Sequence, residues 1–350
     1  MNRARFYANV LAKIGAERSF LLSEEKLRRL TECKNLEEVT SELKDTIYSE
    51  TIANVSRPYS ARKFERAFRE NLIKTICKII RNSPETIRNF LEMYLLRFEI
   101  ENIKTALRAA SVGLPLEEIS SRIYLQVEDF LKRKEAFTKA ITAVNVRSVV
   151  EDLKDTEYAP LLMVGLKRYD ETSSIQPFEI LLDKMFYQKL GDTFKDLPKN
   201  EQKHALFYVS LENDGFNFCT ILRAKELGYD PHWIRMAISR HSFKVSEETI
   251  EDLIMAENFE ESLKIVRQTY YRKFFSRGEK PEEIVSMAEE DFRKAVFMHA
   301  KKTRVGDLFN VGAVLSFLIQ KEVETRNLTV ISLGIEYEWK PDDILTMLLL

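Results

Sequence analysis

The chain has 350 residues, of which 54 are basic and 55 acidic, so its formal net charge is −1. This balance excludes the basic excess that is typical of nucleic-acid-binding proteins, and a hydrophobic content of 45% excludes intrinsic disorder. With only 10 glycines and 9 prolines, the chain is short of the residues that a sheet-rich fold needs for its many turns. We therefore expect an all-α protein.

The three cysteines, Cys33, Cys77 and Cys219, are far apart and form no CxxC pair. Scattered cysteines predict reduced thiols in a cytoplasmic setting, without a disulfide framework or a zinc site. The first residues include arginines but no continuous apolar stretch, so we expect no signal peptide. No segment reaches the ~18 apolar residues of a membrane span. If the protein works at a membrane, we expect another protein to hold it there.

In chain order, the first clear signal is a helix start at Ser23, which precedes Glu24 and Glu25. The oxygen of such a serine can accept a hydrogen bond from a free backbone N–H group of the first turn. Ser246, Glu247 and Glu248 repeat this pattern, whereas the middle of the chain has Arg133-Lys134-Glu135 at the corresponding place. The sequence therefore predicts the same helix three times, with a serine cap in two copies.

The next motif runs from Asn35 to Tyr48 and ends in L-K-D-T-x-Y. This run recurs unchanged at 153–158, where it ends in Tyr158. A third copy begins at Asn258 and keeps only the threonine and tyrosine. We interpret these residues as anchors that close the bend into the following helix, with contact to a partner protein as the alternative. The anchors are Thr46, Tyr48, Thr156, Tyr158, Thr269 and Tyr271.

A second helix follows in each copy, marked by apolar side chains at intervals of four residues. Such an interval places them along one face of a helix, which must be buried. The three stripes are Phe64, Phe68, Leu72, Ile76 and Ile80; Phe178, Leu182, Phe186 and Leu190; and Phe292, Val296 and Ala300.

The third repeated element pairs an acid with an asparagine three residues later, so that both share a helix face. The pairs are Glu99 and Asn102, Asp214 and Asn217, and Glu324 and Asn327. We interpret them as buried hydrogen-bond anchors that fix helix register, because an active site is rarely copied three times; the alternative is a functional site. Arg108 and Arg223 follow at matching offsets near the helix ends, where they can stabilise free carbonyl groups or meet an acidic partner.

The repeats predict three similar helical-bundle domains, 1–113, 114–228 and 229–350, each with three longer helices. The first two boundaries are predicted near Gly113 and Gly228, and the third copy is predicted to end near Gly334. Residues 335–350 then begin an unfinished fourth unit. We expect this tail to pack beside the N-terminal region and to close a three-part ring.

Motifs for chemistry are missing from the sequence. There is no GxxxxGK[ST] or GxGxxG loop for a nucleotide, and the four histidines lack the spacing of metal ligands. We therefore expect no catalytic residue, no cofactor and no metal site.

Two segments carry a family resemblance: E-N-I-K-T-A-L-R-A at 101–109 and N-F-C-T-I-L-R-A-K-E-L-G at 217–228. A third, at 311–331, includes Ser316-Phe317 and Lys321-Glu322-Val323-Glu324. The chain resembles, over essentially its whole length, the C subunit of archaeal A-type and bacterial V-type rotary ATPases, which is related to the d subunit of the vacuolar ATPase. Thr329 departs from the arginine that is frequent in this family.

The resemblance implies a funnel of three helical domains with pseudo-threefold symmetry and no catalytic activity. It implies a peripheral position on the cytoplasmic face of the membrane, where the rotor complex holds the protein. The implied partners are the D and F subunits of the central stalk and the membrane rotor ring, with no nucleic acid and no small-molecule substrate. The implied task is to transmit torque for proton- or sodium-coupled ATP synthesis or hydrolysis.

Two other classes of function stay open at this stage. One is a helical adaptor, unrelated to rotary motors, that binds a partner helix or peptide in its cavity. The other is a helical enzyme with an unrecognised pocket. Co-purifying proteins separate the first from the rotor function, and loss of a measured activity after a single carboxylate substitution would favour the second.

Overall fold

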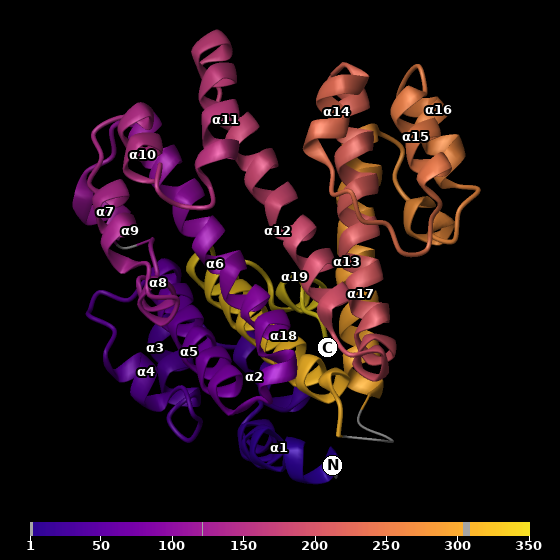
Figure 1. Cartoon of the computed structure of the whole chain (residues 1–350). Coiled ribbons are helices and arrows are strands. Elements are labelled where there is room, and N and C mark those ends of the chain that lie inside the picture. Colours follow the sequence, from indigo (N-terminus) through magenta and orange to yellow (C-terminus); the bar gives the residue numbers. More distant parts are fainter. Residues whose placement is uncertain (1–2, 121, 304–308) are drawn as a thin grey trace. The chain divides into compact units, whose positions relative to one another are not determined.

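The computed structural model describes residues 3–120, 122–303 and 309–350 of the chain (Figure 1). Within these residues every regular element is a helix, so the predicted all-α class is confirmed. Most of the helices recur in one order, which follows the three sequence repeats, and two helices lie outside that order.

Two sets of long helices form the framework. The acid–asparagine motif lies on helices of 28, 28 and 26 residues: α6 (Glu85–Val112), α13 (Lys199–Glu226) and α18 (Val311–Glu336). The apolar stripes lie on helices of 22, 21 and 22 residues: α5 (Ala61–Asn82), α12 (Gln176–Asp196) and α17 (Pro281–Lys302). Every stripe residue is buried, as the four-residue interval predicts.

Shorter helices connect the long ones. The helices that begin at the serine-cap position or its equivalent are α2 (Glu24–Thr31), α9 (Lys134–Ile141) and α15 (Glu247–Met255). The helices that begin after the repeated asparagine are α3 (Leu36–Glu42), α10 (Val146–Asp152) and α16 (Phe259–Val266). After the tyrosine come α4 (Ser49–Ala53), α11 (Ala159–Thr172) and the 3₁₀ helix η1 (Arg272–Phe275). The long helices α6, α13 and α18 are each followed by a short helix, which is α7 (Leu116–Ser120), α14 (Pro231–Ala237) and α19 (Pro341–Thr346), respectively. Two helices stand outside this scheme, α1 (Arg3–Ser19) and α8 (Gln126–Phe130).

The predicted helix caps are present. The side chains of Ser23 and Ser246 accept hydrogen bonds from the backbone N–H groups of Lys26 and Thr249. Arg133 occupies the same position before α9 without a side-chain cap bond. Two copies thus begin with a satisfied serine cap, and the middle copy uses this position differently.

The described residues divide into two compact units, and the divisions fall inside α6 and α17. Unit 1 combines 1–88 with 297–350. In it, α18 packs against α5, and α19 packs against α2. Ile344 and Leu348 from the tail share a hydrophobic core with Leu30 and Tyr48. The expectation that the tail packs beside the N-terminal region is confirmed.

Unit 2 comprises 89–296 and contains two successive copies of the helix series. Here α12 packs against both α11 and α13, and α13 also packs against α14 and α16. The ring of Phe292 stacks on that of Phe274 at a centroid distance of 4.2 Å, and the rings of Phe218 and Tyr271 meet edge to face at 5.5 Å. Buried aromatic side chains therefore form much of the core of this unit.

The three long helices α6, α13 and α18 end in the same kind of turn, but a glycine forms it in only two of them. Gly113 and Gly228 have φ values of 65° and 72°, and Glu338, not Gly334, takes this left-handed position with φ 54°. Each residue after it donates its backbone N–H to the carbonyl five residues back, as in Leu114 to Ala109 and Trp339 to Gly334. Gly334 instead lies inside α18, where a Cβ would come within 2.5 Å of the Ile344 side chain. Close packing against Ile344, and not the turn, therefore requires Gly334, and α18 ends nearby at Glu336.

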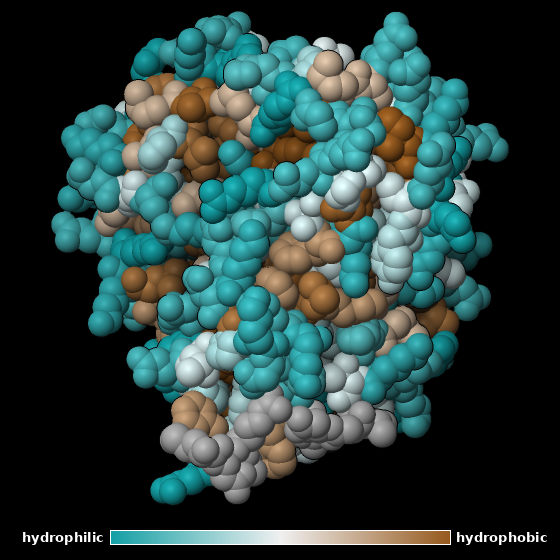
Figure 2. All heavy atoms as spheres, turned by 45° about the vertical axis from the view of Figure 1, so that its right-hand side comes forward, coloured by the Kyte–Doolittle hydropathy of each residue, from teal (hydrophilic) through white to brown (hydrophobic). Residues whose placement is uncertain are grey.

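The surface is mainly hydrophilic, as expected from the high content of charged residues. Figure 2 shows a face on which hydrophilic side chains dominate and apolar ones form separate patches. Among the described residues, no helix is both long enough and apolar enough to traverse a bilayer.

Candidate functional site

The repeated tyrosines and the repeated acids, which the sequence presented as separate motifs, meet in the structure. Each tyrosine hydroxyl donates a hydrogen bond to an acid from a different copy of the repeat. The oxygen–oxygen distances are 2.6 Å for Tyr48 to Glu324, 2.7 Å for Tyr158 to Glu99 and 2.7 Å for Tyr271 to Asp214. The pairing is therefore made between repeats, and the last repeated acid, Glu324, pairs with the first repeated tyrosine, Tyr48.

In unit 1, the joint of Glu324 and Tyr48 includes a buried lysine. Lys321 donates from Nζ to the hydroxyl oxygen of Tyr48 at 2.6 Å and to the carboxylate of Glu324 at 2.9 Å. The backbone N–H of Leu22, just before the cap of α2, donates to the other carboxylate oxygen. Lys321 and Glu324 are 1% and 5% exposed, so their charges compensate one another away from water.

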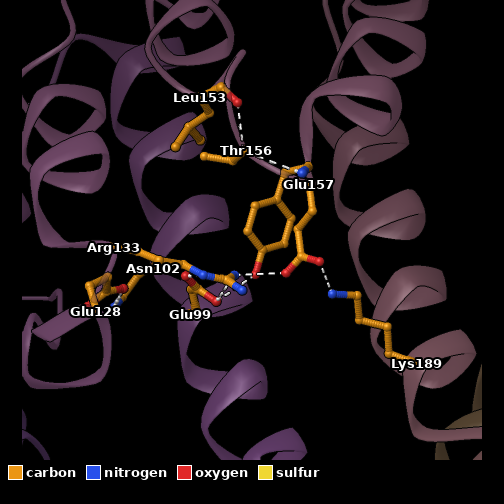
Figure 3. Close-up of polar contacts among 9 residues, drawn as sticks. Glu99, Asn102, Glu128, Arg133, Leu153, Thr156, Glu157 and Lys189 are labelled. Carbon is orange, nitrogen blue, oxygen red and sulfur yellow. Dashed lines mark hydrogen bonds and ion pairs between the residues drawn. The ribbon is translucent and has the colours of Figure 1, made fainter. Parts of the chain in front are cut away.

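In unit 2, the joint of Glu99 and Tyr158 includes an arginine (Figure 3). Arg133, at the cap position of α9, donates from Nη1 to Glu99 at 3.1 Å and to Glu157 at 2.8 Å. Lys189 on α12 forms an ion pair with the same Glu157. These ion pairs join α6, the start of α9 and α12. The cap position of α9 therefore holds an arginine that binds two acids, in place of a serine that caps the helix.

The joint of Asp214 and Tyr271 uses backbone donors instead of a cation. The N–H groups of Phe243 and Lys244 each donate to Asp214 at 2.9 Å. These residues precede the cap of α15, as Leu22 precedes that of α2. In these two copies the loop before the capped helix supplies backbone donors to the acid, and in the middle copy Arg133 supplies a side-chain donor from the same region.

Burial governs the protonation of these joints. Desolvation raises the pKa of Glu99 and of Asp214, and the tyrosine hydrogen bonds oppose that rise. Desolvation together with the neighbouring acid raises the pKa of all three tyrosines, which keeps them protonated as donors. The joints thus consist of neutral hydroxyls that donate to buried carboxyl groups.

The three asparagines make the same pair of backbone hydrogen bonds. Each Oδ1 accepts from the N–H of the residue 22 positions later, and each Nδ2 donates to the carbonyl of that same residue. The bonded residues are Tyr124 for Asn102, Ser239 for Asn217 and Leu349 for Asn327. An amide with one acceptor and one donor edge is suited to this clamp. It fixes the segment that returns along each long helix.

The threonines act locally, as the sequence predicts for a bend. Each Oγ1 donates to the carbonyl three residues earlier and accepts from the N–H of the tyrosine. The donor–acceptor distances to the carbonyls are 2.7, 2.6 and 2.7 Å for Thr46, Thr156 and Thr269. The threonine thereby holds the backbone turn that aims the tyrosine at its acid.

Arg108 and Arg223 have partners on the neighbouring helix of the same unit. Arg108 donates from Nε to Glu179 on α12 at 2.6 Å, and Arg223 binds Glu289 on α17 through two hydrogen bonds of 2.5 and 2.8 Å. Their predicted partners were carbonyl groups or an acidic partner protein, and no sequence pattern pointed to these glutamates. In the third copy Leu333 takes the equivalent place.

Glu128 is a buried acid that the repeats do not reveal, because the other copies lack it. It is 0% exposed and accepts a hydrogen bond of 2.6 Å from Asn102 Nδ2, while no donor among the described residues reaches its Oε2. Desolvation raises the pKa of Glu128 to about 7. It is therefore a titratable group within the asparagine clamp of α6.

These arrangements suit a structural role. The repeated acids are 5% exposed or less, and their donors come from the chain itself. A substrate would have to displace those donors to reach a carboxylate. Across 3–120, 122–303 and 309–350, no group of three acidic, histidine or cysteine side chains is placed to hold a metal ion.

Comparison with known proteins shows which family has a similar sequence. A family model described as ATP synthase (C/AC39) subunit matches residues 10–347. The A-type ATP synthase C subunit of Methanocaldococcus jannaschii is 29% identical, and the match covers 98% of this chain and 86% of that protein. The proteins of the same name from Pyrococcus furiosus and Methanothermobacter thermautotrophicus are each 27% identical, with matches that cover 97% and 93% of this chain and 89% and 82% of theirs.

Proposed function

Because the chain belongs to the ATP synthase (C/AC39) subunit family, whose members are accessory subunits and not the catalytic one, we propose that it is the central-rotor subunit of a rotary ATP synthase. It links the stalk of the D and F subunits to the membrane rotor ring. In that place it passes torque for ATP synthesis or hydrolysis that is coupled to protons or sodium ions. It lies peripherally on the cytoplasmic face of the membrane, held by its partners.

The observation that supports this role best is the triple joint between repeats. A torque adaptor must resist twisting, and stiffness comes from dense packing and from satisfied buried polar contacts. Tyr48, Tyr158 and Tyr271 each bind an acid from another copy, and the asparagine clamps repeat beside them. Every copy is thus tied to another by groups that water cannot reach.

We further propose that the repeats form three modules in a pseudo-threefold, funnel-like arrangement, with the sequence divided at 113 and 228. The joints cross these divisions: Glu99 precedes the first and Tyr158 follows it, as Asp214 and Tyr271 flank the second. Such crossing contacts would lock successive modules together. On a ring of different symmetry, the modules cannot repeat one set of contacts, so we expect polar, adaptable contacts on the ring side.

The experiment is affinity purification of the tagged chain from detergent-solubilised membranes, with the associated proteins identified by mass spectrometry. The proposal requires the D and F subunits and the ring protein to co-purify in a fixed ratio. If only a soluble helical protein or peptide is recovered, the chain is an adaptor unrelated to rotary motors. A measurable catalytic activity that is lost in a Glu99→Gln variant of normal stability would instead favour an enzyme.

A further inference from the structure

Helix α8 is one of the two helices outside the repeated order, and it brings a buried acid next to the asparagine clamp of α6. Glu128 of α8 lies 26 residues after Asn102 and is 0% exposed. The residue 26 positions after Asn217 is Phe243, whose backbone N–H donates to Asp214 at 2.9 Å. The middle copy therefore has an acid where the third copy has a hydrogen-bond donor.

Glu128 has fewer side-chain donors than the acid one helix away. Glu99 on α6 accepts hydrogen bonds from the Tyr158 hydroxyl at 2.7 Å and from Arg133 Nη1 at 3.1 Å. Among the described residues, the one side-chain donor to Glu128 is Asn102 Nδ2 at 2.6 Å, and its Oε2 has no hydrogen-bond partner. A buried carboxylate needs donors or a cation to remain ionised, so Glu128 keeps its proton to a higher pH than Glu99 does.

The charges near Glu128 balance one another without it. Arg133, at the start of α9, binds Glu99 and Glu157, and Lys189 of α12 binds the same Glu157. These two cations and two acids compensate, so an ionised Glu128 would be an unpaired buried charge. Desolvation, and then the charge of Glu99, raise the pKa of Glu128 to about 7. The other charged side chains of 122–139 are exposed or partly exposed: Arg122, Asp129, Lys132, Lys134, Glu135 and Lys139.

The side-chain amide of Asn102 is divided between the clamp and Glu128. Its Nδ2 donates to the carbonyl of Tyr124 at 3.3 Å, whereas the corresponding bonds of Asn217 and Asn327 are 3.0 and 2.7 Å long. The clamp bond is therefore longest in the copy where an acid competes for the same nitrogen. Tyr124 and Glu128 are four residues apart, so a displacement of the acid also pulls on the clamped residue.

We propose that residues 122–133 are a proton-controlled latch, which stays clamped to α6 while Glu128 is protonated and opens when Glu128 is ionised, so that the carboxylate reaches water. The stabilisation of the closed latch is complete below pH ~4.5 and is lost as the pH rises to about 7. Opening also breaks the bond of 2.8 Å from the N–H of Arg133 to the Glu128 carbonyl. Because Arg133 holds Glu99, the latch makes the joint of Glu99 and Tyr158 sensitive to pH. The latch operates whether or not the chain is a rotor subunit.

The test is hydrogen exchange of the full chain at pH 6 and pH 8, measured by mass spectrometry and corrected for the intrinsic pH dependence of amide exchange. Protection of 122–133 in the wild type should fall by about tenfold between these pH values, because the open latch releases its proton near the ordinary pKa of a glutamate and the closed latch near 7. The segment 341–349, which Asn327 clamps and which has no buried acid, should keep its protection.

Two variants assign the effect to one carboxyl group. Glu128→Gln keeps an acceptor oxygen but cannot ionise, so the protection of 122–133 should no longer depend on pH. Asp129→Asn, at a neighbouring side chain that is 70% exposed, is the matched control and should retain the wild-type fall. The latch is overturned if wild type and Glu128→Gln lose protection equally, or if 122–133 in the wild type loses none. An equal loss in 341–349 would also overturn it, and this comparison within the wild type holds even where a variant fails to fold.

Discussion

At the scale of single residues, the buried tyrosine hydroxyls are the clearest determinants of stability. Tyr48→Phe removes a donor to Glu324 and an acceptor for Lys321 while keeping the ring in the core. Leaving such buried polar groups without a partner should cost about 1–3 kcal/mol of unfolding free energy. Urea denaturation of the wild type and the variant measures this difference in unfolding free energy. Tyr270→Phe, at a residue that is 61% exposed, is the control and should change nothing; equal effects of the two substitutions would contradict the role of the joint.

Glu128 predicts a pH dependence. Its pKa is about 7 in the folded chain and near the ordinary value of 4.5 when unfolded, so the folded state holds the proton more tightly. This stabilisation is complete below pH ~4.5 and is lost as the pH rises to about 7. Glu128→Gln imitates the protonated form, so at pH 8 it should exceed the wild type by about 3 kcal/mol of unfolding free energy, and at pH 4 the two should agree. Denaturant titrations at both pH values are the measurement, and a constant difference between the two proteins would contradict the prediction.

The sequence identified the repeated residues but not how they pair. Repetition reveals a position that recurs in all copies, and it named the three repeated acids, asparagines, threonines and tyrosines, but not Glu157 of the middle joint. It could not reveal the roles of Arg133 or Glu128, since each occurs in one copy only. For Lys321 the sequence does hold a signal, because this lysine precedes Glu324 by three residues and so shares its helix face. The pairing between copies is a long-range contact that no local pattern specifies.

At the scale of helices, the clamp asparagines hold returning segments in place. Asn327→Ala should leave the N–H and carbonyl of Leu349 without their side-chain partner and so loosen α19. We expect amide exchange of the Leu349 N–H to accelerate by about tenfold or more, since a lost buried hydrogen bond costs about 1–3 kcal/mol. Hydrogen exchange measured by NMR or mass spectrometry gives the result. Asn54→Ala, on an exposed helix end, is the control, and unaltered exchange in the Asn327 variant would argue against a clamp.

The end of α18 offers a stabilising change. Glu338 has φ 54°, a conformation that glycine adopts without the steric cost of a Cβ. Glu338→Gly should therefore raise the unfolding free energy by about 1 kcal/mol. Lys294→Gly, at an exposed position inside α17, should lower it by about the same amount, because glycine is unfavourable in a helix interior. Two substitutions to glycine with effects of the same sign would refute this account of the turn.

The same helix end shows the limit of reading glycines from sequence. Gly113 and Gly228 lie at the left-handed position, as their repeat offsets predict, but Gly334 does not. A glycine can be required by φ or by a close neighbour, and sequence does not distinguish the two. At Gly334 the neighbour is Ile344, which reaches α18 only because the tail folds back. Local pattern and tertiary packing thus use glycine for different reasons near the end of these helices.

At the scale of the whole molecule, unit 1 depends on both ends of the chain. Deleting 341–350 removes Ile344 and Leu348 from the core that contains Leu30 and Tyr48. Two buried side chains of this kind contribute about 3–6 kcal/mol, so unit 1 should lose much of its protection against hydrogen exchange. Exchange in 36–55 should accelerate, while exchange in 205–222 of unit 2 should stay unchanged. Equal acceleration in both segments would mean that the two units do not respond separately.

Unit 1 is built from two segments that are far apart in the sequence, and this affects folding during translation. Residues 89–296 are continuous, so unit 2 can fold while the ribosome is still translating. Helices α2 to α5 emerge before it, yet the surface that covers them, α18 and α19, is synthesised after it. The early segment therefore waits for a partner that is made only after unit 2, and its apolar side chains stay uncovered until α18 and α19 emerge. A stop codon anywhere between unit 2 and α18 would leave that early segment permanently uncovered.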